Sequence, residues 1–123
     1  MNLLLDSVIL IDHFNGVAQA TAFLAERHGD SVLSVITRAE VLAGFSSVDD
    51  AGVAASLLDR FPTLGIDKAV ADLAAALRRE HRWKLPDAFQ VAIAHKHALR
   101  LVTRNTRDFP PQQFDFVLVP YTR

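Results

Sequence analysis

Four acidic residues either follow short apolar runs of strand length or lie at the starts of expected helices, at places where a ligand site can form. They are Asp6, Glu40, Asp87 and Asp108. Four converging carboxylates would repel one another and raise their own pKa values, so the group makes sense chiefly as a divalent-metal site. All-oxygen ligation favours Mg²⁺, with Mn²⁺ as the alternative. The chemistry expected there is hydrolysis of a phosphodiester by a water activated at the metal.

Each acid also has a structural explanation when it is taken alone. The segment Thr37–Glu40 matches a capping box, in which Thr37 and Glu40 satisfy amides at the start of a helix. Asp6 suits a helix N-cap, Asp87 suits the first turn of a helix, and Asp108 suits a turn. The metal-site hypothesis therefore depends on a fold that brings the four acids together.

Apolar runs of strand length alternate with segments of helical periodicity. The expected strands are Asn2–Leu5, Ser31–Val35, Arg100–Thr103, Phe116–Val119 and a further short one at Leu64–Ile66. The expected helices are Val17–Arg27, Ala51–Phe61, Ile66–Trp83 and Ala88–His97. Continuous apolar runs indicate a parallel sheet covered on both faces. The sequence thus predicts an α/β domain, in which ligands bind at the carboxyl ends of the strands.

Composition favours one globular domain, which we expect to span residues 1–123. Half of the residues are hydrophobic and 22% are charged, as in ordinary folded domains. The chain has no cysteine, so disulfides and thiolate metal sites are excluded. The apolar stretch Met1–Phe14 lacks a basic start and contains Asp6 and Asp12, which makes it a poor signal peptide and too short for a membrane span. We expect a cytoplasmic protein without membrane contact.

The formal net charge of −1 argues against bulk electrostatic binding of nucleic acid, which needs many contacts from lysine and arginine to phosphates. A nucleic-acid substrate must then be held locally. One basic cluster precedes Asp87, and three more arginines follow later. These residues are Arg78, Arg79, Arg82 and Lys84, then Arg100, Arg104 and Arg107. They either orient an RNA backbone or form solvated helix ends.

Four segments in order carry a family pattern. They are Leu3–Asp12, Ser34–Glu40, Leu85–Ala88 and Leu101–Phe109. Together they resemble the PIN-domain nucleases, specifically the VapC-like toxins of bacterial toxin–antitoxin pairs, from Leu3 to Val119. The resemblance implies an α/β/α sandwich around a central parallel sheet and an endoribonuclease that depends on Mg²⁺ or Mn²⁺. It also implies a VapB-like antitoxin partner and a homodimer.

The resemblance assigns roles by position. The residues that correspond to the family's catalytic metal ligands are Asp6, Glu40, Asp87 and Asp108. Ser7, Thr103 and Asn105 are candidates for contacts that support the ligands or bind a phosphate. Two departures are visible: Val8 stands where the family usually has a small polar residue, and Phe89–Val91 replaces a more usual aliphatic run. The first affects the surroundings of the metal, and the second affects packing.

The resulting hypothesis is in-line attack of water on an RNA phosphodiester, which leaves a 5′-phosphate and a 3′-hydroxyl. A catalytically silent PIN-like module that binds a protein, or a PIN nuclease in RNA processing outside a toxin–antitoxin pair, would show the same pattern. An aspartyl-phosphate enzyme would show a second Asp at Val8, and a receiver domain would show a lysine near Arg104. Trp83 either stacks on a base or packs inside the domain. The spacing of His95 and His97 does not suit a helical zinc site.

Overall fold

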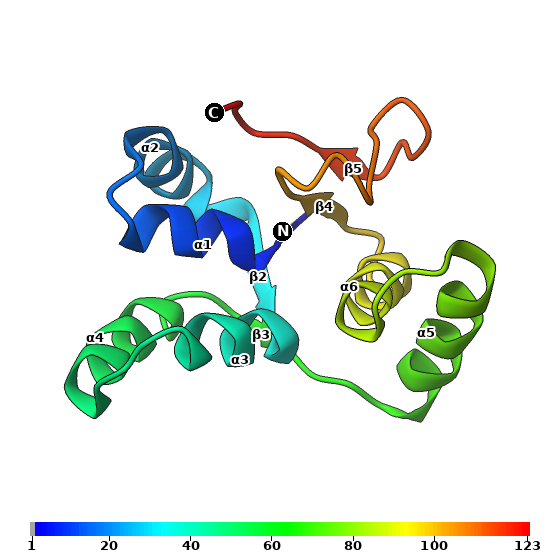
Figure 1. Ribbon diagram of the computed structural model, residues 1–123, viewed down its shortest axis with the longest axis horizontal. Coiled ribbons are helices and arrows are strands. Elements are labelled where there is room, and N and C mark those ends of the chain that lie inside the picture. Colours follow the sequence, from blue (N-terminus) through cyan, green and yellow to red (C-terminus); the bar gives the residue numbers. More distant parts are fainter. Residues whose placement is uncertain (1) are drawn as a thin grey trace.

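A five-stranded parallel sheet forms the centre of the molecule, with the strand order β3-β2-β1-β4-β5 (Figure 1). The computed structural model describes residues 2–123, so Met1 of the expected domain lies outside the described range. The strands are β1 (Leu3–Leu5), β2 (Ser31–Ser34), β3 (Thr63–Leu64), β4 (Arg100–Val102) and β5 (Val117–Leu118). Neighbouring strands all pair in parallel. The predicted parallel sheet is confirmed, but its short strand β3 lies at Thr63–Leu64 and not at the predicted Leu64–Ile66.

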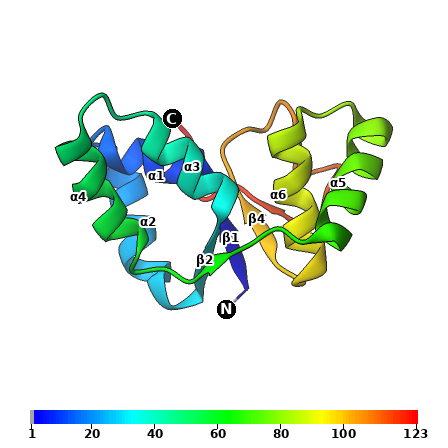
Figure 2. The ribbon, with the colours of Figure 1, turned by 90° about the horizontal axis from the view of Figure 1, so that it is seen from below.

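Helices cover both faces of this sheet. They are α1 (Ser7–Phe14), α2 (Ala18–Arg27), α3 (Val35–Ala43), α4 (Val48–Leu58), α5 (Lys68–His81) and α6 (Leu85–Lys96), with a short 3-10 helix, η1 (His28–Asp30). Figures 1 and 2 show α1 to α4 on one side and α5 with α6 on the other. The predicted α/β/α sandwich is thereby confirmed. No helix in residues 2–123 has the length and apolar character that a bilayer crossing requires.

The central strand β1 shows how the sequence builds the two cores. Successive side chains of a strand point to opposite faces of the sheet. Leu4 packs with the apolar side chains of α5 and α6, whereas Leu3 and Leu5 pack with those of α1 to α4. All three leucines are at most 1% exposed. The uninterrupted apolar run in the sequence therefore reflects burial on both faces.

The predicted capping box at the start of α3 is wrong. Ser34 is the N-cap, and its Oγ accepts the Thr37 amide hydrogen at 3.0 Å. Because Ser34 ends β2 and supplies the capping oxygen three residues earlier, α3 begins at Val35 and Glu40 falls in its second turn. The Thr37 hydroxyl is then available to donate to the Leu5 carbonyl at 2.9 Å.

Other helix boundaries also differ from those expected, and three of them have a clear local reason. Ser47 caps α4 through the Asp50 amide at 3.0 Å, so that helix starts before Ala51. Pro86 fits the first turn of α6, which therefore starts at Leu85. Arg82 adopts a left-handed conformation with φ of 60° and ends α5. The helix ends thus follow capping and backbone geometry more closely than apolar periodicity.

Candidate acidic site

Asp6 stands where β1 meets α1, and its carboxylate is held on both oxygens. As the N-cap of α1, its Oδ1 accepts the Ser7 amide hydrogen at 2.9 Å. Thr103, which directly follows β4, donates its hydroxyl to Oδ2 at 2.7 Å. The Gln90 Nε2 lies 3.4 Å from Oδ1. Because β1 and β4 are parallel neighbours, their carboxyl ends bring Asp6 and Thr103 together.

Asp87 lies half-buried in the first turn of α6, and the other acids around it shift its pKa. Burial and the charges of Asp6, Asp108 and Glu40 raise the pKa of Asp87 to about 6, against a smaller opposing effect of Lys84. A carboxylate responds in this way only to charges at short range. The fold therefore gathers the four predicted acids around one region at the carboxyl edge of the sheet.

Glu40 reaches this region from the second turn of α3. Burial of its carboxyl group raises its pKa, and the charge of Asp6 acts in the same direction. The Ser7 side chain offsets part of this shift by a hydrogen bond to Glu40. Ser7, predicted as a supporting residue, thus contacts two of the acids, one through its amide and one through its hydroxyl.

Asp108 is fixed within the loop that follows β4. The Asn105 Nδ2 donates to its Oδ2 at 3.0 Å, and the Asp108 amide donates to the Asn105 Oδ1 at 3.3 Å. The Asn105 amide in turn donates to the Thr103 hydroxyl oxygen at 3.0 Å. Thr103 and Asn105 therefore form a hydrogen-bonded path between Asp6 and Asp108.

Trp83 holds the far end of the same loop. Its indole Nε1 donates to the Asp108 carbonyl at 3.0 Å, and its ring, 6% exposed, packs on Phe109 and Phe114 and stacks on His81 at 4.2 Å. Because the ring is buried between aromatic neighbours, the packing interpretation of Trp83 fits the structure better than base stacking.

Trp83→Phe is expected to keep an aromatic ring in place while it removes the hydrogen bond to Asp108. We expect the free energy of unfolding to fall by about 1–2 kcal/mol, because the Asp108 carbonyl loses its partner and the smaller ring leaves a gap. Urea unfolding measures this change. Val48→Ala, at a side chain that is 88% exposed, should cost less than about 0.5 kcal/mol. Equal costs for the two variants would contradict the anchoring role.

The donor set of the site consists of carboxylate oxygens, which suit Mg²⁺ and Mn²⁺. Within residues 2–123, no three histidine, aspartate or glutamate side chains lie close enough to bind one ion directly. Mg²⁺ usually keeps several waters and binds through one or two carboxylates. The raised pKa of Asp87 also indicates an excess of negative charge that a cation would relieve. The residues present therefore fit an ion that is held partly through water.

A second acidic group, Asp12, belongs to a different kind of cluster. Asp12 is only 2% exposed, and both its carboxylate oxygens accept hydrogen bonds. Arg104 donates from Nε at 2.6 Å and from Nη2 at 3.0 Å. Tyr121 donates from its hydroxyl at 2.8 Å, and Arg123 donates from Nη1 at 3.3 Å. Burial alone would raise the pKa of Asp12, but these hydrogen bonds and the two arginine charges lower it overall. Asp12 is thus a structural anchor.

No functional role was predicted for Asp12 or Gln90, although the sequence carries one signal for each. Each is a polar residue among positions that a helix buries: Asp12 follows the buried Ile9 and Leu10, and Gln90 precedes the buried Val91. Buried polar side chains in helices require partners. The sequence could show that partners exist but could not identify them.

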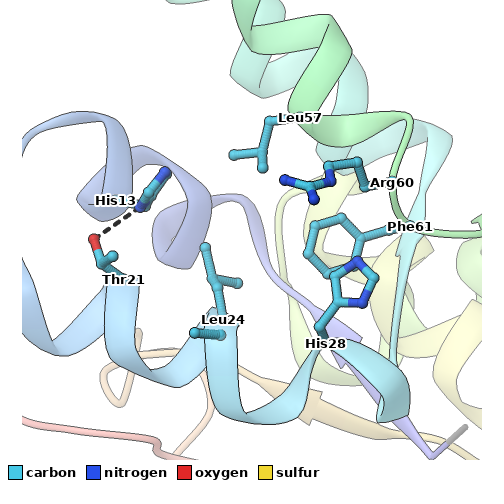
Figure 3. A pocket seen from close by; sticks show the side chains of 8 residues that line it. His13, Thr21, Leu24, His28, Leu57, Arg60 and Phe61 are labelled. Carbon is cyan, nitrogen blue, oxygen red and sulfur yellow. Dashed lines mark hydrogen bonds between the residues drawn. The ribbon is translucent and has the colours of Figure 1, made fainter.

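A separate pocket of about 470 Å³ lies between α1, α2 and α4 (Figure 3). Apolar side chains such as Leu24, Leu57 and Phe61 line it together with His28 and Arg60. The pocket also contains the contact between the His13 Nδ1 and the Thr21 Oγ1, 2.8 Å apart. None of the four acids lines this pocket, so its chemistry is separate from theirs.

A parallel α/β/α fold with acids gathered at the carboxyl edge of its sheet has the architecture of a nuclease domain. The PIN domain family matches residues 3–111, which is most of the chain. The protein therefore belongs to the PIN-domain family.

Individual relatives extend this match. Ribonuclease VapC10 of Mycobacterium tuberculosis is 32% identical over 114 residues, which cover 88% of this chain and 86% of the relative. A chain from a toxin–antitoxin complex of Klebsiella pneumoniae is 36% identical with a TM-score of 0.88, and 98% of both chains is covered. FitAcB from Neisseria gonorrhoeae is 25% identical with a TM-score of 0.78, covering 96% of this chain and 97% of that one. The predicted VapC-like nuclease is confirmed.

Proposed function

We propose that this protein is the toxin of a VapBC-type pair and hydrolyses RNA at its acidic site with Mg²⁺ or Mn²⁺. The acids of the site are Asp6, Glu40, Asp87 and Asp108. The observation that carries the proposal is the convergence of these acids at the carboxyl edge of the sheet, where Asp6 follows β1 and Asp87 lies in the first turn of α6. Burial and the charges of the other three acids accordingly raise the pKa of Asp87 to about 6. The ribonuclease name of the mycobacterial relative supports RNA as the substrate.

The residues of the site are assigned different roles. Asp6 and Asp87 would hold the ion, with Asp108 and Glu40 completing the surroundings. Bound there, a divalent ion would supply charge stabilisation at the phosphate and a more acidic water. Thr103 and the Ser7 amide keep the Asp6 carboxylate in one orientation, so little reorganisation is needed when RNA binds.

Proton transfer is assigned to Glu40. Its raised pKa makes it a better proton acceptor than an ordinary surface carboxylate. It takes the proton of the attacking water as the new bond from oxygen to phosphorus forms and the bond from phosphorus to the 3′ oxygen breaks. The departing 3′ oxygen takes a proton from solvent water. The products are a 5′-phosphate and a 3′-hydroxyl.

The basic residues near the acids also divide into two groups. Arg78 donates to the Trp83 carbonyl at 2.8 Å, Arg100 to the Val117 carbonyl at 3.1 Å, and Arg104 to Asp12. These three arginines serve the fold. The remaining members are exposed and are assigned to the RNA backbone. They are Arg79, Arg82, Lys84 and Arg107.

The decisive experiment is cleavage of total cellular RNA by purified protein with Mg²⁺, with Mn²⁺ or with EDTA. We expect cleavage that needs a metal ion, leaves 5′-phosphate ends and is lost in Asp6→Asn. Asparagine is as good an N-cap as aspartate, so this variant should fold. Asp72→Asn, an exposed acid of α5, is the matched control and should cleave like the wild type.

A second readout separates an inactive enzyme from a protein that binds no metal. If the proposal holds, Mn²⁺ raises the melting temperature of the wild type more than that of Asp6→Asn, because an ion that binds only the folded state stabilises it. Absence of both cleavage and a melting shift would contradict the proposal and favour a silent PIN-like module that binds a protein.

Partners are part of the same proposal. The chain from Klebsiella pneumoniae was solved in a toxin–antitoxin complex, which supports a VapB-like antitoxin for this protein. Val48 and Val53 of α4 are 88% and 71% exposed and offer apolar surface to a partner.

We further propose that the chain is a single domain, forms a homodimer and acts in the cytoplasm, where its RNA substrates are found.

A further inference from the structure

Gln90 lies next to the acidic site and is only 1% exposed. It stands on α6, three residues after Asp87. An amide at this depth costs free energy unless its oxygen and nitrogen are hydrogen-bonded. Its Oε1 accepts the Ser34 hydroxyl at 2.5 Å, its Nε2 donates to the Thr37 Oγ1 at 2.7 Å, and the same Nε2 makes a longer contact of 3.4 Å with the Asp6 Oδ1.

The surrounding hydrogen bonds fix the orientation of this amide. The Thr37 hydroxyl donates its hydrogen to the Leu5 carbonyl at 2.9 Å, so its oxygen accepts from Gln90. The Ser34 oxygen accepts the Thr37 amide at 3.0 Å, which leaves the hydroxyl hydrogen of Ser34 for the Gln90 Oε1. A rotated amide would set an oxygen against the Asp6 carboxylate. The nitrogen of Gln90 therefore faces Asp6.

Gln90 connects the elements that carry three of the four acids. It belongs to the helix of Asp87, contacts Asp6 at the end of β1, and bonds two residues at the start of the helix of Glu40. Within residues 2–123, no other side-chain hydrogen bond joins α6 to α3 or to Asp6. The apolar contacts between these elements are not directional, whereas the amide bonds favour one relative position.

We propose that Gln90 is a positioning residue, which holds Asp6 and Asp87 in the relative position at which they bind a divalent ion. The inference rests on the proposed function, because it concerns the same acids. Because Gln90 is only 1% exposed, it is assigned no direct contact with the ion or the RNA. It acts through the carboxylate of Asp6 and through the placement of α6 against α3.

The test is Mn²⁺ binding by Gln90→Met, which keeps the length of the side chain and removes all three contacts. Loss of a residue that orients metal ligands typically costs 10- to 100-fold in metal affinity. We therefore expect the dissociation constant for Mn²⁺, measured by electron paramagnetic resonance of the free ion, to rise about 10-fold or more. The RNA concentration at half-maximal rate should stay unchanged. Gln19→Met, at an exposed position of α2, should bind Mn²⁺ like the wild type.

Two further variants keep the test decisive if Gln90→Met folds poorly. Thr37→Val removes the acceptor of the Gln90 nitrogen and should weaken Mn²⁺ binding in the same direction, while Thr37→Ser keeps the hydroxyl and should restore it. Wild-type Mn²⁺ affinity in both Gln90→Met and Thr37→Val would overturn the proposal for Gln90 alone. Failure of the wild-type protein itself to bind Mn²⁺ would overturn the proposed function and this inference with it.

Discussion

Asp87→Asn is expected to abolish metal-dependent RNA cleavage while it makes the metal-free protein more stable. The variant removes one carboxylate from the group that would bind the ion. A loss of about 4 kcal/mol in transition-state stabilisation corresponds to a fall of about 1,000-fold in kcat/KM. Asparagine keeps the shape of the side chain and suits the first turn of a helix, so folding should be preserved.

The gain in stability follows from the pKa of Asp87. Burial and three neighbouring acids raise this pKa from 3.8 to about 6 in the folded protein, so the folded state binds the proton more tightly than the unfolded state does. The wild type therefore loses stability as the pH rises from about 4 to about 6. At pH 7.5 the loss is roughly 1–2 kcal/mol, after allowance for solvent screening at this half-buried position.

Urea unfolding in EDTA at pH 4 and at pH 7.5 measures this effect. The two proteins should have similar free energies of unfolding at pH 4, and Asp87→Asn should be the more stable at pH 7.5. Mn²⁺ should reverse the order, because the wild type binds the ion better. Destabilisation of Asp87→Asn at pH 7.5 without metal would show instead that the carboxylate serves the fold, and retained cleavage would remove Asp87 from the active site.

The convergence of the acids at one edge of the sheet could be predicted because their positions follow from strands and helices that are visible in the sequence. Asp6 and Asp108 follow apolar runs, and parallel strands bring such residues to one edge. The start of α3 could not be decided in the same way. Ser34 and Thr37 are both good capping residues, and only the end of β2 at Ser34 determines which of them caps the helix.

The polar contacts beneath the site escaped prediction because their partners are distant in sequence. Gln90 bonds Thr37 across 53 residues and Ser34 across 56, and Arg104 bonds Asp12 across 92. Periodicity identifies the face on which a side chain lies but does not identify the residue opposite it. The sequence left Arg104 either as a contact to RNA or as part of a solvated helix end, whereas in the fold it is the partner of a buried carboxylate.

Arg104→Met is expected to lower the free energy of unfolding by about 3 kcal/mol, the largest stability effect among the variants considered. Loss of one partner leaves a buried charge without full compensation, which typically costs about 3–5 kcal/mol. Tyr121 and the half-exposed Arg123 still contact Asp12, so the lower end of that range applies. The surface pair of Arg38 and Asp59, 2.7 Å apart, gives the matched control: Arg38→Met should cost less than about 1 kcal/mol.

The cost of Arg104→Met should also depend on pH in a defined direction. Hydrogen bonds and arginine charges hold the pKa of Asp12 below its usual value in spite of burial. The stability that Asp12 contributes is therefore present above the unfolded pKa, about 3.9, and is lost as the pH falls through the folded pKa. Urea unfolding should show a large difference between wild type and Arg104→Met at pH 7 and a smaller one at pH 3.

A double-mutant cycle then tests whether the two residues act as one unit. Asp12→Asn with Arg104→Met should cost less than the sum of the single variants, since the second substitution removes the charge that the first left uncompensated. Arg104 also stands between Thr103 and Asn105, so the single variant should reduce cleavage through the loop of Asp108. If Arg104→Met lowers the free energy of unfolding no more than Arg38→Met does, the pair of Asp12 and Arg104 contributes only what a surface ion pair does. The hydrogen bond from Thr103 to Asp6 would then have to position the loop of Asp108 without help from Arg104.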